Sequence, residues 1–219
     1  MTSRSAVAAA AVAALLLAAY ANHFENGFHF DDDHAIVNNP FVRDVANIPR
    51  FFADATTSSI LPSNRSYRPM LQTTVAIDYW IAGGYDPVAF QIDSFIWFVL
   101  QLACMWWLFT RIFAVARPFQ GRVGGAESPA LHALAPTAIY ALHPVCAETV
   151  NYIVQRGEII STCGVVAALA MYAGAPRLRR THAYLIPFAI GVLAKPPALV
   201  FPALLFMFAG RSPVPQGCW

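Results

Sequence analysis

Three consecutive carboxylates, Asp31, Asp32 and Asp33, follow a long apolar N-terminal segment and are the residues best suited to chemistry. Unpaired carboxylates beside apolar surface are costly to desolvate, so they either face water or serve a reaction. Because a like charge disfavours ionisation of its neighbour, one carboxylate of the run can be tuned as a general base. The run therefore predicts either a solvated acidic turn, or a general base or metal-ligand cluster.

Two further polar groups lie between apolar segments in the second half of the chain. The first comprises His143, Glu148, Arg156 and Glu158. It is either a salt-bridged turn that anchors its neighbouring segments, or a polar rim in which Arg156 binds a phosphate. The second is Lys195, the only lysine. It is either a functional group at membrane depth or a side chain that extends to the interface.

The composition indicates the kind of protein that must position these groups. Of the 219 residues, 58% are hydrophobic and 12% charged, against about 45–50% and about 25% in soluble domains. A net charge of +2 does not suggest nucleic acid as a partner. The four cysteines show no metal-ligand spacing. We therefore expect an integral protein of the lipid bilayer.

Six apolar segments are candidates for spans, because about 20 residues cross about 30 Å of hydrocarbon. They are residues 5–24, 92–112, 129–145, 158–175, 181–194 and 196–210. The last two meet at Lys195-Pro196-Pro197, where prolines favour a break. The first could instead be a cleaved signal peptide, with Arg4 as its basic end and Ala19-Tyr20-Ala21 as its cleavage pattern.

The placement of arginines predicts which side the connections face. The cluster Arg177-Leu178-Arg179-Arg180 indicates a cytoplasmic connection. The loop over residues 22–93 and the turn over residues 143–158 are then outside. A loop this long is expected to carry structure of its own. Its patterns predict amphipathic helices after Asn47 and over residues 67–81. The fold class expected is an all-α polytopic bundle with a helical outer loop.

Five motifs occur in one order along the chain: Phe28-x-Phe-Asp-Asp-Asp, Ser66-Tyr-Arg-Pro-Met, His143-Pro-x-x-x-Glu, Gln155-Arg-Gly-Glu and Leu193-Ala-Lys. Together they resemble the transmembrane and tetratricopeptide-repeat O-mannosyltransferases and their bacterial relatives, in the C-type glycosyltransferase (GT-C) superfamily. The resemblance extends over roughly residues 28–202 and implies a GT-C-like bundle. No 34-residue repeat is detectable, so we expect the N-terminal part of such a protein, without the repeat domain.

The resemblance implies an inverting glycosyltransferase. Such an enzyme moves a sugar from a polyprenyl-phosphate carrier to a hydroxyl group of a protein or glycan outside the cytoplasm. The expected location is a bacterial inner membrane, with the site facing the periplasm. The family's acidic pair corresponds to Asp31 and Asp32, its His-Pro…Glu segment to His143 and Glu148, and its Arg-x-Glu to Arg156 and Glu158. Pro196 stands where the family usually has Glu, which leaves the role of that carboxylate open.

The chemistry of such a transfer assigns a role to each group. Asp31 is expected as the catalytic base, with Asp32 or Asp33 orienting it or binding a divalent metal, whose ligands would be Asp31 and Asp32. Arg156 and Lys195 are expected at the donor phosphate. The remaining candidates, in supporting positions, are Asp33, Arg68, His143, Glu148 and Glu158.

Two other classes of protein remain open from the sequence. A non-catalytic membrane scaffold, or an inactive fragment of the enzyme, would keep the fold without a full site. A transporter would use the break at Lys195-Pro196-Pro197 as a discontinuous helix. Internal symmetry between the two halves would favour the transporter, and none is evident by eye.

The predicted topology can be tested by cysteine labelling. In a cysteine-free background, Asp44→Cys should react with a membrane-impermeant thiol reagent in right-side-out vesicles, because the long loop is expected outside. Arg122→Cys should stay unlabelled until the membrane is permeabilised, because its connection is expected in the cytoplasm. The opposite labelling pattern would contradict this topology.

Overall fold

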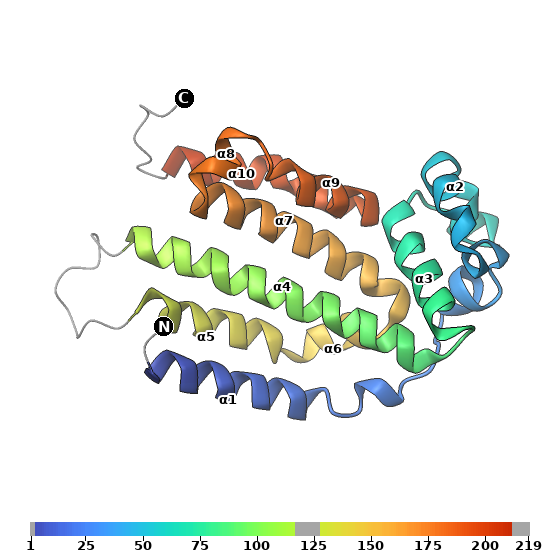
Figure 1. The fold of residues 1–219 in the computed structure, drawn as a ribbon, viewed down its shortest axis with the longest axis horizontal. Coiled ribbons are helices and arrows are strands. Elements are labelled where there is room, and N and C mark those ends of the chain that lie inside the picture. Colours follow the sequence, from blue (N-terminus) through green and yellow to red (C-terminus); the bar gives the residue numbers. More distant parts are fainter. Residues whose placement is uncertain (1–2, 117–127, 212–219) are drawn as a thin grey trace.

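The computed structural model describes residues 3–116 and 128–211, and this part of the chain is helical with no strand. Its long helices run side by side in one bundle (Figure 1). These bundle helices are α1 (Ser3–Ala19), α4 (Pro87–Ala116), α5 (Pro129–Ala141), α6 (Pro144–Asn151), α7 (Arg156–Gly174), α9 (Leu185–Ala194) and α10 (Phe201–Arg211). The predicted all-α membrane bundle is therefore confirmed. The connection that carries Arg122 lies outside the described residues.

Within residues 3–116 and 128–211, three segments are helices long and apolar enough to cross a membrane: Ser5–Glu25, Pro87–Ala114 and Ile153–Gly174. A fourth candidate is the pair α5 and α6, which is bent by 67°. The bend lies at His143-Pro144, where a proline starts the second helix. α9 and α10 are shorter apolar helices, and whether each crosses the membrane stays a prediction.

The expected break in the last apolar region is present. α9 ends at Ala194, and Lys195 has extended backbone with φ −160° and ψ 136°. A 3-10 helix, η9 (Pro196–Val200), then leads into α10. Two consecutive prolines remove two backbone donors and exclude a continuous α-helix here.

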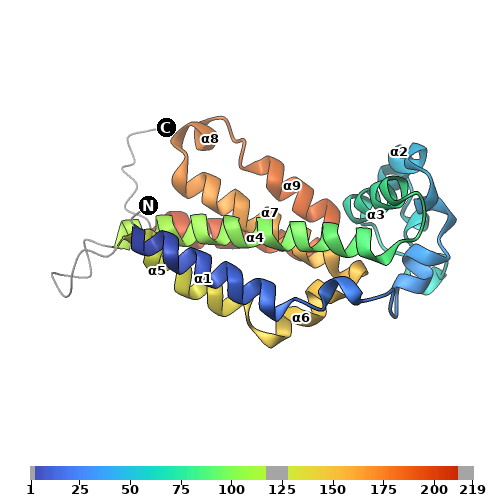
Figure 2. The same cartoon turned by 60° about the horizontal axis from the view of Figure 1, so that its bottom comes forward.

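The loop over residues 22–93 forms a helical cap at one end of the bundle (Figure 2). Its main helices are α2 (Ile48–Ala53) and α3 (Pro69–Ala82), so both predicted loop helices are confirmed. α3 begins with Pro69 and ends at Gly83, whose φ of 69° is left-handed. α4 begins at Pro87, ahead of the expected residue 92, because the Asp86 side chain accepts a hydrogen bond from Val88 N at 3.1 Å.

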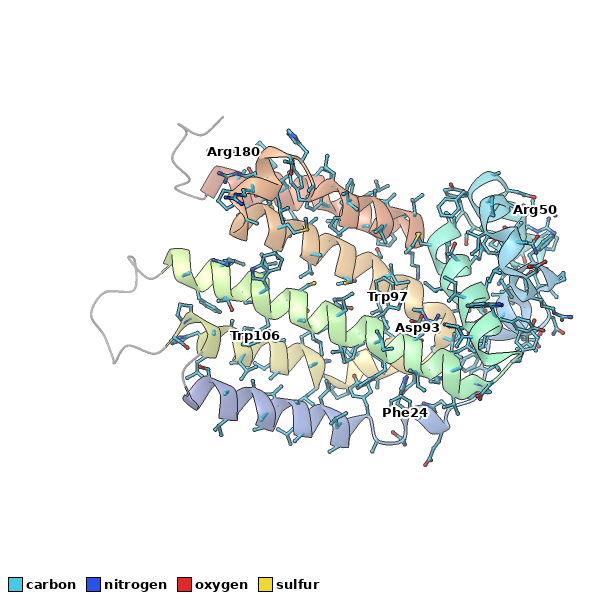
Figure 3. The ribbon with its side chains drawn as sticks, viewed as in Figure 1. Phe24, Arg50, Asp93, Trp97, Trp106 and Arg180 are labelled. Carbon is cyan, nitrogen blue, oxygen red and sulfur yellow. The ribbon has the colours of Figure 1, made fainter. Side chains whose placement is uncertain are left out.

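The cap is packed onto the bundle through one buried apolar cluster. Its members come from the acidic turn, from the 3-10 helix η3 (Pro40–Arg43), from α2 and α3, from the start of α4, and from the 3-10 helix η8 (Ile153–Gln155) that precedes α7. They are Ile36, Val42, Phe51, Leu71, Val75, Ala76, Phe90, Ile153 and Val154. Arg50 in the cap and Arg180 lie at opposite ends of the molecule (Figure 3). The arginine cluster is therefore far from the cap, as the predicted topology requires.

α7 and α9 approach closely at two glycines, Gly164 and Gly191, both of which are buried. A Cβ atom at Gly164 would lie 2.4 Å from the Pro187 carbonyl oxygen and 2.9 Å from Gly191 Cα. Small residues allow such backbone contacts between membrane helices, where packing supplies much of the association energy. The crossing places α9, and with it Lys195, against α7.

We expect Gly164→Ala to separate α7 from α9. The added methyl group meets backbone atoms that cannot rotate away, so the loss of stability should be about 1–3 kcal/mol. Thermal unfolding in detergent micelles, followed by circular dichroism, measures the loss. Gly27→Ala is the matched control, because a Cβ atom there has no neighbour within 4 Å. Equal melting temperatures for both variants would contradict the close crossing.

Candidate functional site

A cavity of about 340 Å³ lies between the acidic turn and α3. Its lining combines one exposed carboxylate, two arginines and several small polar side chains: Asp31, His34, Ala35, Ile36, Ser58, Ser63, Asn64, Arg65, Ser66, Arg68, Leu71, Gln72, Val75 and Val154. Of the residues expected to do chemistry, Asp31 and Arg68 are brought together here. This cavity is the candidate active site.

Asp31 presents its carboxylate to solvent, with 56% of the side chain exposed. Its Oδ1 lies 3.2 Å from His34 Nε2, and its backbone N–H donates to the Tyr152 hydroxyl at 2.8 Å. The preceding residue, Phe30, has a φ of 49° and is 87% exposed. Left-handed backbone is unfavourable for Phe, and strain of this kind is found at functional sites. The turn thus holds Asp31 outward at some conformational cost.

Asp32 points the other way and is fully buried. Its Oδ2 accepts a hydrogen bond from His29 N at 2.9 Å, and its Oδ1 accepts one from Val154 N at 2.9 Å. Burial raises the pKa of Asp32 to about 6, against the opposing effect of the two N–H donors. Asp32 fastens the acidic turn to the start of α7. This bond and the bond from Asp31 N–H to the Tyr152 hydroxyl pack the acidic turn against the segment over residues 143–158.

The donor set does not suit a metal shared by Asp31 and Asp32. One carboxylate is at the surface, whereas the other lies in the interior with each oxygen facing a backbone N–H. Across residues 3–116 and 128–211, no three His, Cys, Asp or Glu side chains come together as metal ligands. We derive no step through a metal ion at these residues.

Positive charge lines the same cavity. Arg68 precedes α3, and its Nε is buried without a hydrogen-bond partner in the described part of the chain. The neighbouring Arg65 donates from Nε to the Ser59 carbonyl at 3.2 Å. A buried guanidinium N–H without an acceptor is rare in folded proteins. An oxygen atom of a ligand in the cavity could accept a hydrogen bond from this N–H group.

Arg156 is the centre of a buried network rather than part of an exposed rim. Its side chain has no exposed surface. NH1 lies 2.5 Å from an Asp78 oxygen and 2.8 Å from an Asp93 oxygen. Nε donates to Ser94 Oγ at 3.0 Å and NH2 to the Phe90 carbonyl at 2.6 Å. Asp93 lies where α4 approaches α3 (Figure 3). The phosphate role of Arg156 stays a prediction. To bind a phosphate, the guanidinium would have to break its contact with one of these partners.

The network around Arg156 holds two carboxylates and one guanidinium. Burial and the like charge of Asp93 raise the pKa of Asp78 to about 7, although Arg156 favours its charged form. A proton on Asp78 leaves one buried positive charge facing one negative charge. The network is therefore electrically balanced when Asp78 is protonated.

The other predicted residues lie apart from the first cavity. Lys195 Nζ is 2.6 Å from Glu158 Oε1 and 3.2 Å from Gln155 Oε1. Glu158 and Glu148 line a second cavity of about 260 Å³ within the bundle.

His143 and Asp33 make local contacts. His143 is exposed and caps α6 by accepting a hydrogen bond from Val145 N at 3.2 Å. Asp33 is exposed and accepts one from Asn38 Nδ2 at 2.9 Å. Neither residue lines either cavity.

The sequence analysis did not single out His34, Asn64 or Gln72, all of which line the first cavity. His34 follows Asp31 by three residues, a spacing at which side chains meet in a helical turn. That spacing was the available signal. Asn64 and Gln72 offered none, because the fold alone brings them to the acidic turn.

Known proteins resemble this chain in sequence. It is 30% identical to human protein O-mannosyl-transferase TMTC4 over 158 residues, which are 68% of this chain and 20% of that protein. It is also 30% identical to Drosophila melanogaster protein O-mannosyl-transferase Tmtc1 over 167 residues, or 74% of this chain and 18% of the fly protein. The chain thus spans about a fifth of the length of the curated relatives it matches. No family model and no solved structure matches it.

We expect Arg156→Ala to destabilise the protein strongly, because it leaves the buried Asp78 and the partly buried Asp93 without a cation. Breaking a buried ion pair by removing one partner costs about 3–5 kcal/mol. Thermal unfolding in detergent measures the effect. Arg50→Ala is the control, since Arg50 pairs with Asp54 at the surface and surface pairs contribute about 0–1 kcal/mol. A melting temperature for Arg156→Ala close to that of Arg50→Ala would contradict the buried network.

Proposed function

Because this chain belongs to the family of transmembrane and tetratricopeptide-repeat O-mannosyltransferases, matching its N-terminal part only, we propose that it carries the catalytic base of a membrane glycosyltransferase. The donor is a polyprenyl-phosphate sugar and the acceptor is a hydroxyl group of a protein. The observation that carries the proposal is the cavity in which an exposed carboxylate, Asp31, faces arginine side chains.

The reaction assigns the proton to Asp31. The acceptor oxygen forms a bond to the anomeric carbon of the sugar while the bond from that carbon to the phosphate oxygen breaks. The acceptor proton passes to Asp31, and the electron pair of the broken bond leaves with the polyprenyl phosphate. A carboxylate at the surface of the cavity can reach an acceptor hydroxyl, which the buried Asp32 cannot.

Arg68 is the arginine best placed for the departing phosphate. Its Nε lacks a partner in the described part of the chain, and it lines the cavity that holds Asp31. Positive charge at a leaving phosphate stabilises the charge that develops there. Arg156 is less suited, since its donors are engaged with Asp78, Asp93 and other protein groups. Lys195, which pairs with Glu158 and is 17% exposed, is the second candidate for binding the donor phosphate.

The cap and the arginine cluster support a site outside the cytoplasm. The cavity belongs to the cap, and the basic cluster with Arg180 lies at the opposite end of the bundle. If that cluster is cytoplasmic, the cavity faces the other side of the membrane. For a bacterial inner membrane this side is the periplasm.

Asp31→Asn should remove most sugar transfer while the protein still inserts and folds. The amide keeps the shape of the carboxylate but cannot take the acceptor proton, and general-base help is worth about 10²–10⁴-fold. The assay is transfer from a polyprenyl-phosphate sugar in proteoliposomes, normalised to protein amount. Asp33→Asn is the control, because its carboxylate is exposed and lies outside the cavity lining.

Each outcome of this assay has a distinct meaning. Loss of transfer in Asp31→Asn but not in Asp33→Asn supports the proposal. Full transfer by Asp31→Asn would contradict Asp31 as the base. Wild-type protein without transfer would favour the non-catalytic scaffold.

A further inference from the structure

We propose that His34 is a positioning residue, which fixes the direction of the Asp31 carboxylate by donating its Nε2 proton to Oδ1. The proposal rests on the role of Asp31 in the proposed function. His34 lies 3.2 Å from Asp31 Oδ1 and lines the same cavity. A base holds its reacting geometry only when neighbouring groups fix its side chain.

A chain of hydrogen bonds leads to the other imidazole nitrogen, Nδ1, and supports a proton on Nε2. The backbone N–H of Leu61 donates to Ser59 Oγ at 2.9 Å. The hydroxyl proton of Ser59 is then free to point to His34 Nδ1, 2.9 Å away. With Nδ1 as acceptor, the proton of the neutral ring sits on Nε2 and faces Asp31. With its own proton pointing to Nδ1, the Ser59 hydroxyl supports the ring protonated at Nε2.

The side-chain nitrogen of Asn64, Nδ2, also lies 3.0 Å from His34 Nε2. If its NH2 group donated there, Nε2 would present a lone pair to the Asp31 carboxylate, and the two would repel. Turning the Asn64 amide over, so that Oδ1 in place of Nδ2 faces Nε2, removes this conflict, because Oδ1 then accepts the same proton. Which atom of an amide faces a neighbour is settled by the hydrogen-bond network. The Ser63 hydroxyl, 2.8 Å from Asn64, can serve either orientation.

The side chains of His34 and Asp31 differ in how closely the protein surrounds them. The side chain of His34 is 11% exposed, and its carbonyl accepts a hydrogen bond from Ile60 N at 3.2 Å. Arg65 holds the Ser59 carbonyl, which keeps the serine in place. Asp31, by contrast, is 56% exposed. The fixed imidazole therefore orients the mobile carboxylate, occupies Oδ1 and leaves Oδ2 to take the acceptor proton.

The tautomer can be observed without turnover. In protein labelled with 15N-histidine, His34→Gln identifies the signals of His34 among the six histidines. We expect a neutral ring protonated at Nε2, and we expect Ser59→Ala to weaken this preference. A His34 ring protonated at Nδ1 alone would overturn the proposal.

The transfer assay tests the consequence for Asp31. His34→Ala should lower kcat about tenfold, because it removes a hydrogen bond to a charged carboxylate at a partly exposed position. The donor KM should change little. His34→Gln keeps an N–H donor and should recover most of the loss. In an Asp31→Asn background, His34→Ala should have no further effect, because the two residues act through one interaction.

Three results would overturn the role of His34: wild-type kcat in His34→Ala, no recovery in His34→Gln at equal melting temperature, or an equal loss in the Asp31→Asn background. Absence of transfer by the wild-type protein, or full transfer by Asp31→Asn, would instead overturn the proposed function. The NMR result separates these cases, because it reports the hydrogen bond between His34 and Asp31 whether or not sugar is transferred.

Discussion

The guanidinium of Arg156 joins three helices that meet at the boundary between cap and bundle. It contacts Asp78 on α3, Asp93 on α4 and the Phe90 carbonyl, from its own position at the start of α7. Buried charges are costly, so each partner is needed to compensate for the loss of water. The segment just before Arg156 holds the acidic turn through Val154 N–H and the Tyr152 hydroxyl. The geometry of the cavity therefore depends on this buried network.

The candidate site residues that line or adjoin a cavity lie in two places, which residues 152–158 connect. On the cap side, Asp31 and Arg68 line an open cavity. On the bundle side, Glu158 contacts Lys195 and shares a second cavity with Glu148. The close crossing of α7 and α9 holds Lys195 beside α7.

Local signals in the sequence predicted the elements, whereas long-range contacts decided the site. Pro69 and Gly83 bound α3 as expected, and Lys195-Pro196-Pro197 breaks the last apolar region. The difference between Asp31 and Asp32 could not be predicted, because adjacent residues of one type differ only in partners far along the chain. Val154, which binds Asp32, is 122 residues away. The interior position of Arg156 depends likewise on lone acidic residues of α3 and α4, which have no motif.

The same network constrains the order in which the protein assembles during its synthesis. Asp78 precedes Arg156 by 78 residues, so α3 and α4 are made well before the cation that neutralises them. Until α7 is inserted, no guanidinium neutralises the carboxylate of Asp93. That end of α4 is then more stable in contact with water or lipid headgroups. The cap, although translated early, can close over the bundle only late. Formation of the cap cavity thus waits for insertion of a helix from the second half of the chain.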